Sequence, residues 1–106
     1  MNHEAVLMVR IYLAESQHLL KPLLKLLLVD LKVRGVTVLR GIEGYGPSGQ
    51  HRGSSLLDLS LDLPLVVEFF DRPERVEAAI ARIRDFVPPD HIVSWPATIA
   101  SEDPAC

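Results

Sequence analysis

Residues 36–46 read Val-Thr-Val-Leu-Arg-Gly-Ile-Glu-Gly-Tyr-Gly, a β-prone run that passes directly into a glycine-rich segment. Val, Thr and Ile fit the pleated surface of a sheet, so residues 36–42 predict a strand. Five of the six glycines in the chain fall between Gly41 and Gly53, and this composition predicts a long loop. Long loops inside compact domains usually carry function, so the segment divides the chain and marks its candidate site.

The half of the chain before the loop predicts a strand, a helix and the strand just described. Residues 5–13 are apolar and β-branched with no turn residue, the pattern of a strand buried largely on both faces. Pro22 suits the first position of a helix and Gly35 the left-handed position beyond its end, so we expect a helix over residues 22–34. Leucines cover most of its circumference, which indicates either deep burial or contact with another subunit.

The half after the loop repeats this order. Residues 63–70 predict a third strand, and Asp71 is the expected cap of a second helix, whose apolar residues recur at helical spacing over 76–87. Residues 93–99 alternate between apolar and polar side chains, the period of a half-buried strand. Pro96 indicates that this last strand lies at an edge of the sheet or carries a bulge.

This order of elements predicts one α+β domain over residues 1–106. Right-handed crossovers favour the ferredoxin-like β-α-β-β-α-β sandwich, a four-stranded antiparallel sheet with two helices on one face and the glycine-rich loop between strands 2 and 3. A content of 48% hydrophobic and 24% charged residues is that of a folded globule with a single core. Residues 100–106 are expected to form a loose tail.

The composition also limits the partners and the compartment. The net charge of −3 supplies no basic field for phosphate backbones, so nucleic acid is not an expected partner. Cys106 is the only cysteine, which excludes an intrachain disulfide and favours a reducing compartment. Residues 1–4 lack the pattern of a secretion signal, and lysines, a proline and an aspartate interrupt the apolar run over 19–31. We therefore expect a cytoplasmic protein.

The segment Gly41–Gly53 is the strongest candidate site. Glycines permit backbone conformations that aim successive N–H groups at one point, which is how proteins hold small anions such as phosphate. Arg40 stands at the end of the preceding strand, where its guanidinium could meet a phosphate or form an ion pair with Glu43 or Glu68. His51 is the one histidine in the segment. The alternative is a flexible connection that binds nothing.

Other motifs are weaker. Gly44-x-Gly46-x-x-Gly49 matches a dinucleotide fingerprint, but the chain is too short for the fold that uses it. Gly41-x-x-x-x-Gly46 begins like a phosphate loop, yet Pro47 stands where lysine is required, which excludes that motif. The four histidines lie in separate segments without ligand spacing, so no metal site is expected within one chain.

Four ordered stretches resemble the PII-like group known as domain of unknown function 190. They are Arg10-Ile-Tyr-Leu13, Lys21-Pro-Leu23, the run from Gly35 to Gly46, and the run from Asp62 to Glu68. The likeness spans about residues 8–99. It implies a ferredoxin-like fold and a homotrimer.

In PII regulators, a Gly-Phe-Gly at the base of the mobile T-loop helps to hold an adenine nucleotide between neighbouring subunits. Gly44-Tyr45-Gly46 is similar to it, and Gly49-Gln50-His51 is similar to the next part of that loop. The resemblance implies nucleotide binding by Gly44, Tyr45, Gly46, Gly49, Gln50 and His51, and Arg40 and Gly41 at the start of the segment complete the predicted set. The second glycine-rich, lysine-bearing loop of PII regulators is replaced here by residues 86–91, which favours a nucleoside monophosphate such as AMP over a triphosphate.

The leading functional hypothesis is a cytoplasmic, trimeric regulator without enzymatic activity, whose glycine loop binds an adenine nucleotide and alters contact with a protein such as a membrane transporter. One alternative is a small ferredoxin-like enzyme of the acylphosphatase type. Those enzymes carry an anion-binding loop directly after the first strand, where residues 14–17 offer neither glycine nor arginine. The other alternative is a trimeric metal-tolerance protein of the same architecture.

Overall fold

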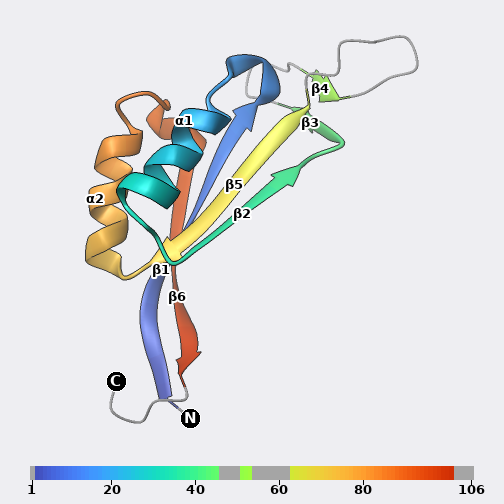
Figure 1. Cartoon of the computed structure of the whole chain (residues 1–106). Coiled ribbons are helices and arrows are strands. Elements are labelled where there is room, and N and C mark those ends of the chain that lie inside the picture. Colours follow the sequence, from blue (N-terminus) through green and yellow to red (C-terminus); the bar gives the residue numbers. More distant parts are fainter. Residues whose placement is uncertain (1, 46–50, 54–62, 102–106) are drawn as a thin grey trace.

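The computed structural model describes residues 2–45, 51–53 and 63–101, and its main elements follow the predicted order (Figure 1). These elements are, in chain order, β1 (Asn2–Ala14), α1 (Leu20–Lys25), β2 (Gly35–Arg40), β5 (Pro64–Asp71), α2 (Pro73–Ile83) and β6 (Ile92–Ser101). Two short strands, β3 (Glu43–Tyr45) and β4 (His51–Gly53), fall between β2 and β5 in the sequence.

Four strands form one sheet in the order β2-β5-β1-β6, and every neighbouring pair is antiparallel. The helices α1 and α2 lie on the same face of this sheet, which confirms the ferredoxin-like sandwich (Figure 1). β6 occupies an edge, as Pro96 predicts, because an edge strand leaves one row of backbone N–H positions without a ladder partner. Ala100 and Ser101, expected in the tail, pair with β1 as part of β6.

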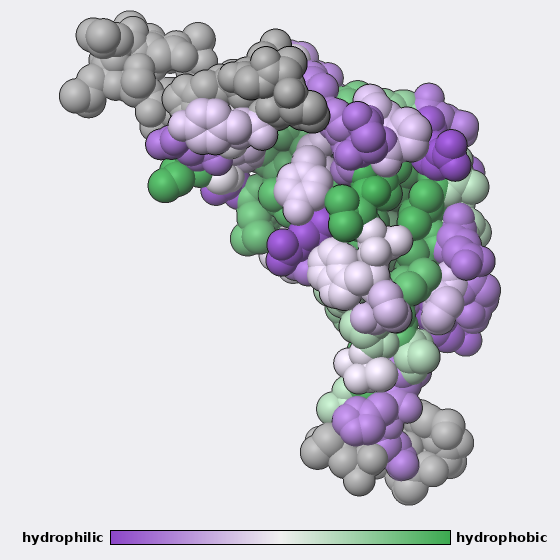
Figure 2. All heavy atoms as spheres, turned by 180° about the vertical axis from the view of Figure 1, so that it is seen from behind, coloured by the Kyte–Doolittle hydropathy of each residue, from purple (hydrophilic) through white to green (hydrophobic). Residues whose placement is uncertain are grey.

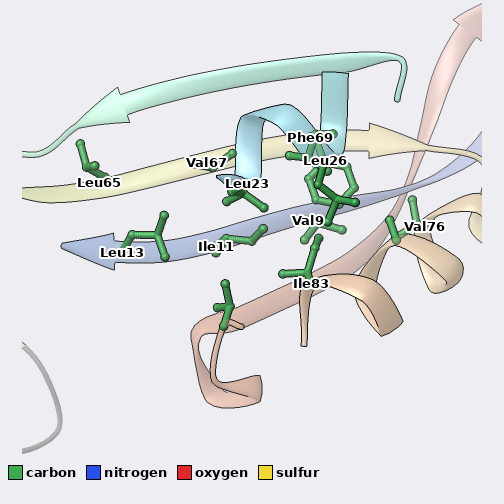
Figure 3. Packing of buried hydrophobic residues seen from close by; sticks show 13 residues of the cluster. Val9, Ile11, Leu13, Leu23, Leu26, Leu65, Val67, Phe69, Val76 and Ile83 are labelled. Carbon is green, nitrogen blue, oxygen red and sulfur yellow. The ribbon is translucent and has the colours of Figure 1, made fainter. Parts of the chain in front are cut away.

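The hydrophobic core lies between the sheet and the two helices (Figure 3). Every second residue of β5 is buried, and in the register of β1 with β5 Val67 lies opposite Ile11 and Phe69 opposite Val9. From the helical layer the fully buried side chains are Leu23, Leu27, Val76, Ala79 and Ile83. β1 was predicted to be buried largely on both faces, and within residues 5–13 only Ala5 and Tyr12 are exposed, Tyr12 to 44% on the face away from the helices.

The first helix differs from the prediction over 22–34 at both ends. It begins at Leu20, and after α1 the chain widens into a π-helical turn over Leu26–Asp30. Lys32, not Gly35, takes the left-handed conformation, with φ 51°. The wider turn shifts the end of the helix, so the position that needs a left-handed residue falls three residues before the glycine.

Gly35 has a different role, because it begins β2 opposite Phe70. A Cβ atom at position 35 would lie 2.5 Å from Cε1 of the Phe70 ring, closer than real contacts allow. Glycine there thus allows the close approach of an aromatic ring and does not cap the helix.

Asp71 does not cap α2 as predicted; it is the last residue of β5 and is completely buried. The residue at the cap position is Arg72, whose backbone N–H donates to Asp71 Oδ1 at 2.8 Å. Arg75 of α2 places Nε 3.5 Å from Asp71 Oδ2, and its guanidinium also donates to the backbone carbonyls of Leu31 and Lys32. One arginine thus joins β5, α2 and the end of the first helix.

We expect Ile83→Ala to lower the free energy of unfolding by about 2–5 kcal/mol, because it leaves a cavity among core side chains. Arg82→Ala, at the neighbouring exposed position of α2, is the matched control and is expected to change it by at most about 0.5 kcal/mol. Urea unfolding of both variants at one protein concentration measures the difference. Equal losses in the two variants would contradict the described core.

Candidate functional site

The glycine-rich segment begins where β2 meets β5. The backbone N–H of Gly41 donates to the Pro64 carbonyl at 2.8 Å, so it extends the pairing of the two strands. A Cβ atom on Gly41 would lie 2.9 Å from Pro64 Cγ, and one on Gly44 would lie 3.2 Å from Pro64 Cβ and Cγ. These two glycines therefore let the start of the segment lie against the proline ring. The backbone N–H of Gly41 is already hydrogen-bonded to Pro64 and is not available to a ligand.

The sequence predicted a loop over the whole segment, but part of it forms strands. β3 and β4 pair antiparallel, with Glu43 opposite Gly53 and Tyr45 opposite His51. Glycine lowers strand propensity without preventing backbone pairing, so the residues between the glycines still form a short ladder beyond the main sheet (Figure 1). Of the predicted site residues, Gly46, Gly49 and Gln50 lie outside the described residues, and His51 is described by its backbone only.

Arg40 forms an ion pair with a residue that the sequence did not indicate. Its Nε lies 2.6 Å from Oε1 of Glu15, and the predicted partners Glu43 and Glu68 are engaged elsewhere. Glu68 lies 3.5 Å from Nε of Arg10, and Glu43 accepts a hydrogen bond from Tyr45. The Arg40 side chain is 66% exposed, so the ion pair alone contributes little stability.

The ion pair lines a pocket of about 290 Å³ at one end of the sheet. Its lining residues are Glu15, His18, Leu20, Lys21, Arg40 and Leu65. The two long cationic side chains outnumber the single carboxylate, which gives the lining a net charge of +1 with His18 neutral. The pocket is thus a positively charged cavity beside the root of the glycine segment.

The turn after β1 positions the acidic side of this pocket. The backbone N–H of Glu15 donates to the Leu63 carbonyl at 3.2 Å, which ties the turn to the start of β5. The Gln17 side chain accepts the Ala14 N–H at 2.9 Å, and His18 closes the turn with a left-handed φ of 55°. These contacts hold the Glu15 side chain beside β2, where Arg40 ends the strand.

Sequence reasoning missed Glu15, His18 and Lys21 as site residues. It tested the turn after β1 for its own glycine or arginine and found neither, whereas the arginine arrives from β2. The order of the strands could have indicated them. β1 and β2 are both antiparallel to β5, so they run in the same direction and their C-terminal ends lie at the same end of the sheet. Polar residues that follow two such strands meet in space even when they are far apart in the sequence.

Tyr45 is the aromatic residue of the predicted Gly-Tyr-Gly motif, and it is 71% exposed. Its hydroxyl donates to Glu43 Oε2 at 2.7 Å. This hydrogen bond, the negative charge of Glu43 and a small loss of solvation together raise the pKa of Tyr45 above its ordinary value of 10.0. The phenol therefore keeps its proton at neutral pH and stays a hydrogen-bond donor.

No helix in the described part of the chain is long and apolar enough to cross a bilayer. Within residues 2–45, 51–53 and 63–101, no three His, Cys, Asp or Glu side chains gather closely enough to hold a metal ion.

We expect Glu43→Gln to lower the pKa of Tyr45 toward 10.0, because the substitution removes the negative charge that opposes phenolate formation. In a Tyr12→Phe background Tyr45 is the sole tyrosine, so the ultraviolet absorbance of tyrosinate during a pH titration reports it alone. Glu77→Gln, an exposed substitution on α2, serves as control. An unchanged titration midpoint in Glu43→Gln would show that the Tyr45–Glu43 contact is not formed in solution.

A raised pKa also fixes the sign of any effect on stability. The folded protein holds the phenol proton more tightly than the unfolded chain, so the contribution of Tyr45 is fully present below pH 10.0 and is lost as the pH rises through its raised pKa.

Comparison with known proteins places this geometry in a family. The family profile of domain of unknown function 190, described as "Uncharacterized ACR", matches residues 6–99. A UPF0166 protein from Aquifex aeolicus (strain VF5) is 36% identical over 81 residues, which cover 73% of this chain and 77% of that protein.

Solved structures share the fold at low sequence identity. CPII from Thiomonas intermedia K12, a nitrogen regulatory PII-like protein bound to ADP, AMP and bicarbonate, has a TM-score of 0.65 and 13% identity, with 94% of this chain and 100% of that chain covered. CutA1 from Oryza sativa has a TM-score of 0.58 and 15% identity, with 93% and 84% covered. The structures thus establish the architecture, and the profile match over most of the length establishes that this chain belongs to the PII-like family of domain of unknown function 190.

Proposed function

We propose that the protein is a regulator that binds an adenine nucleotide such as AMP at the root of the Gly41–Gly53 segment, between subunits of a homotrimer. Binding alters the contact of this segment with a partner protein, for example a membrane transporter, in the cytoplasm. The observation that carries the proposal is the position of Arg40 in the lining of a cationic pocket, at the end of β2 and just before the glycine-rich segment. The fold shared with CPII, a PII-like protein bound to ADP and AMP, supports the choice of ligand.

The geometry after β1 favours a binding protein over an enzyme of the acylphosphatase type. Such an enzyme needs amide and guanidinium donors directed at a phosphate by the loop that follows the first strand. Here that turn presents the Glu15 carboxylate, which lies against Arg40 and opposes an anion at the same place. The arginine is available only to a ligand that competes with Glu15, which suits reversible binding.

The proposed homotrimer is supported by the face of the sheet that the helices leave uncovered. Tyr12, Val66 and Leu39 lie in one row across β1, β5 and β2, and Tyr12 and Leu39 are 44% and 48% exposed. Figure 2, from the side opposite to that of Figure 1, shows apolar side chains exposed between polar ones across the body of the molecule. Several apolar side chains exposed on one uncovered sheet face suit an interaction site, and we assign this face to further copies of this chain.

AMP, ADP and ATP are expected to raise the thermal stability of the protein, with AMP effective at the lowest concentration. A ligand at 100 times its Kd adds about 2.7 kcal/mol to the free energy of unfolding by mass action. Differential scanning fluorimetry followed by calorimetric titration measures the effect, with GMP as the control for the base. No shift with any adenine nucleotide would overturn the proposed ligand.

Tyr12→Asp is expected to convert the trimer into monomers, because it buries an unpaired charge in the proposed interface. Leu28→Asp is the matched control, since Leu28 is 53% exposed on the helical layer and lies outside that face. Light scattering coupled to size-exclusion chromatography reports the mass of each variant. The trimer proposal fails if the unsubstituted protein has the mass of a single chain, or if Tyr12→Asp keeps the mass of three.

A further inference from the structure

We infer that the pocket lined by Glu15, His18, Lys21 and Arg40 binds a phosphate group, and that Glu15 competes with this group for Arg40. The phosphate is either a free ion or the phosphate of a nucleotide. In the second case the inference rests on the proposed function, since it names the part of the nucleotide that lies in this pocket. We refer to the four residues below as the phosphate pocket.

The sheet brings the opposing charges together. Ala14 of β1 lies opposite Pro64 of β5, and Arg40 of β2 lies opposite Leu65, the next residue of β5. β1 and β2 therefore end on either side of the same two residues. Glu15 follows β1 directly, so its carboxylate and the Arg40 guanidinium meet across β5 as a consequence of the strand register.

The charges of the phosphate pocket suit an anion. Apart from its ion pair with Glu15, the Arg40 side chain makes no hydrogen bond, ion pair or ring contact within the described part of the chain. A guanidinium has five N–H donors in a planar fork, a geometry that suits a phosphate group at least as well as a carboxylate. Lys21 and His18 add two more cationic or donor groups, and within residues 2–45, 51–53 and 63–101 their side chains have no hydrogen-bond or ion-pair partner.

The size of the pocket points to a group rather than to a whole cofactor. Its volume of about 290 Å³ falls at the lower end of the roughly 300–1,000 Å³ that ligand sites span. Leu20 and Leu65 provide apolar lining beside the charged groups. A tetrahedral phosphate fits this space, whereas the base and ribose of a nucleotide would extend beyond it.

The contact between Glu15 and Arg40 is close but imperfect. The two atoms lie 2.6 Å apart, yet the N–H of Arg40 does not point at the oxygen with hydrogen-bonding geometry. Glu15 Oε1 is shielded from solvent and accepts no hydrogen bond within the described part of the chain. Because this shielded oxygen lacks a hydrogen bond, its contact with Arg40 is weaker than it could be, and Arg40 can exchange it for a better acceptor. Glu15 therefore acts as an internal anion that a phosphate displaces from Arg40.

Calorimetric titration of the full chain with inorganic phosphate and with AMP tests this inference, and adenosine provides the arm without phosphate. Arg40→Gln and Lys21→Gln are each expected to weaken the binding of both anions about tenfold, the size of one charge-assisted hydrogen bond. Glu15→Gln is expected to strengthen it by a similar factor, because the competitor loses its charge. Lys25→Gln, exposed one turn further along α1 and outside the pocket, is expected to leave both affinities unchanged. Circular dichroism of each variant confirms that it is folded.

The outcomes separate the two proposals. Binding of AMP that none of the pocket substitutions alters would overturn the phosphate pocket and leave the proposed nucleotide function standing. Phosphate binding that follows the expected pattern, with AMP no tighter than phosphate and no binding of adenosine, would support the pocket and overturn the nucleotide function. Weaker binding in Glu15→Gln would overturn the competition, since Glu15 would then be a ligand contact. Absence of binding by both anions would overturn the inference as a whole.

Discussion

The antiparallel register of β1 with β5 is the constraint on which the rest of the structure depends. It sets Val9 against Phe69 and Ile11 against Val67, so one face of the central strand pair is continuously apolar and receives both helices. A shift of one residue would turn this apolar set to the other face of the sheet. The same register places Ala14 opposite Pro64, and it therefore also decides where the polar turn after β1 meets the end of β2.

The fold was predictable because its signals are local and agree with one another. The run over residues 36–42, the alternation over 93–99 and the apolar positions of α2 each specify an element without reference to distant residues. Of the two possibilities that Pro96 indicated, an edge or a bulge, the edge position of β6 is confirmed. The errors concern the residues at the boundaries between elements, where one residue type suits more than one role. The end of the first helix was placed at Gly35 because glycine suits that position, but the π-helical turn moved the left-handed residue to Lys32, and Gly35 accommodates the Phe70 ring instead.

The candidate site was only half predictable for a related reason. Arg40 and Gly41 were predicted because they lie at the start of a glycine-rich segment, a signal contained within a few residues. Glu15 and Lys21 carry no such signal, since what brings them into one pocket with Arg40 is the parallel direction of two strands separated by a third. Pairing of Arg40 with Glu15 rather than with Glu43 or Glu68 follows from the same topology. A local sequence pattern predicts secondary structure, whereas a cluster of charged side chains from three segments forms only when the strands assemble into the sheet.

The buried carboxylate of Asp71 has a consequence for how this chain can diverge. Its Oδ2 is without a hydrogen bond in the described part of the chain and has Arg75 Nε 3.5 Å away, and the same guanidinium binds two carbonyls at the end of the first helix. Loss of Arg75 alone would leave the Asp71 carboxylate buried without its cation, whereas exchange of both residues for apolar side chains avoids that uncompensated buried charge. Positions 71 and 75 should therefore covary among homologues, and homologues in which only one of the two residues has changed should be rare.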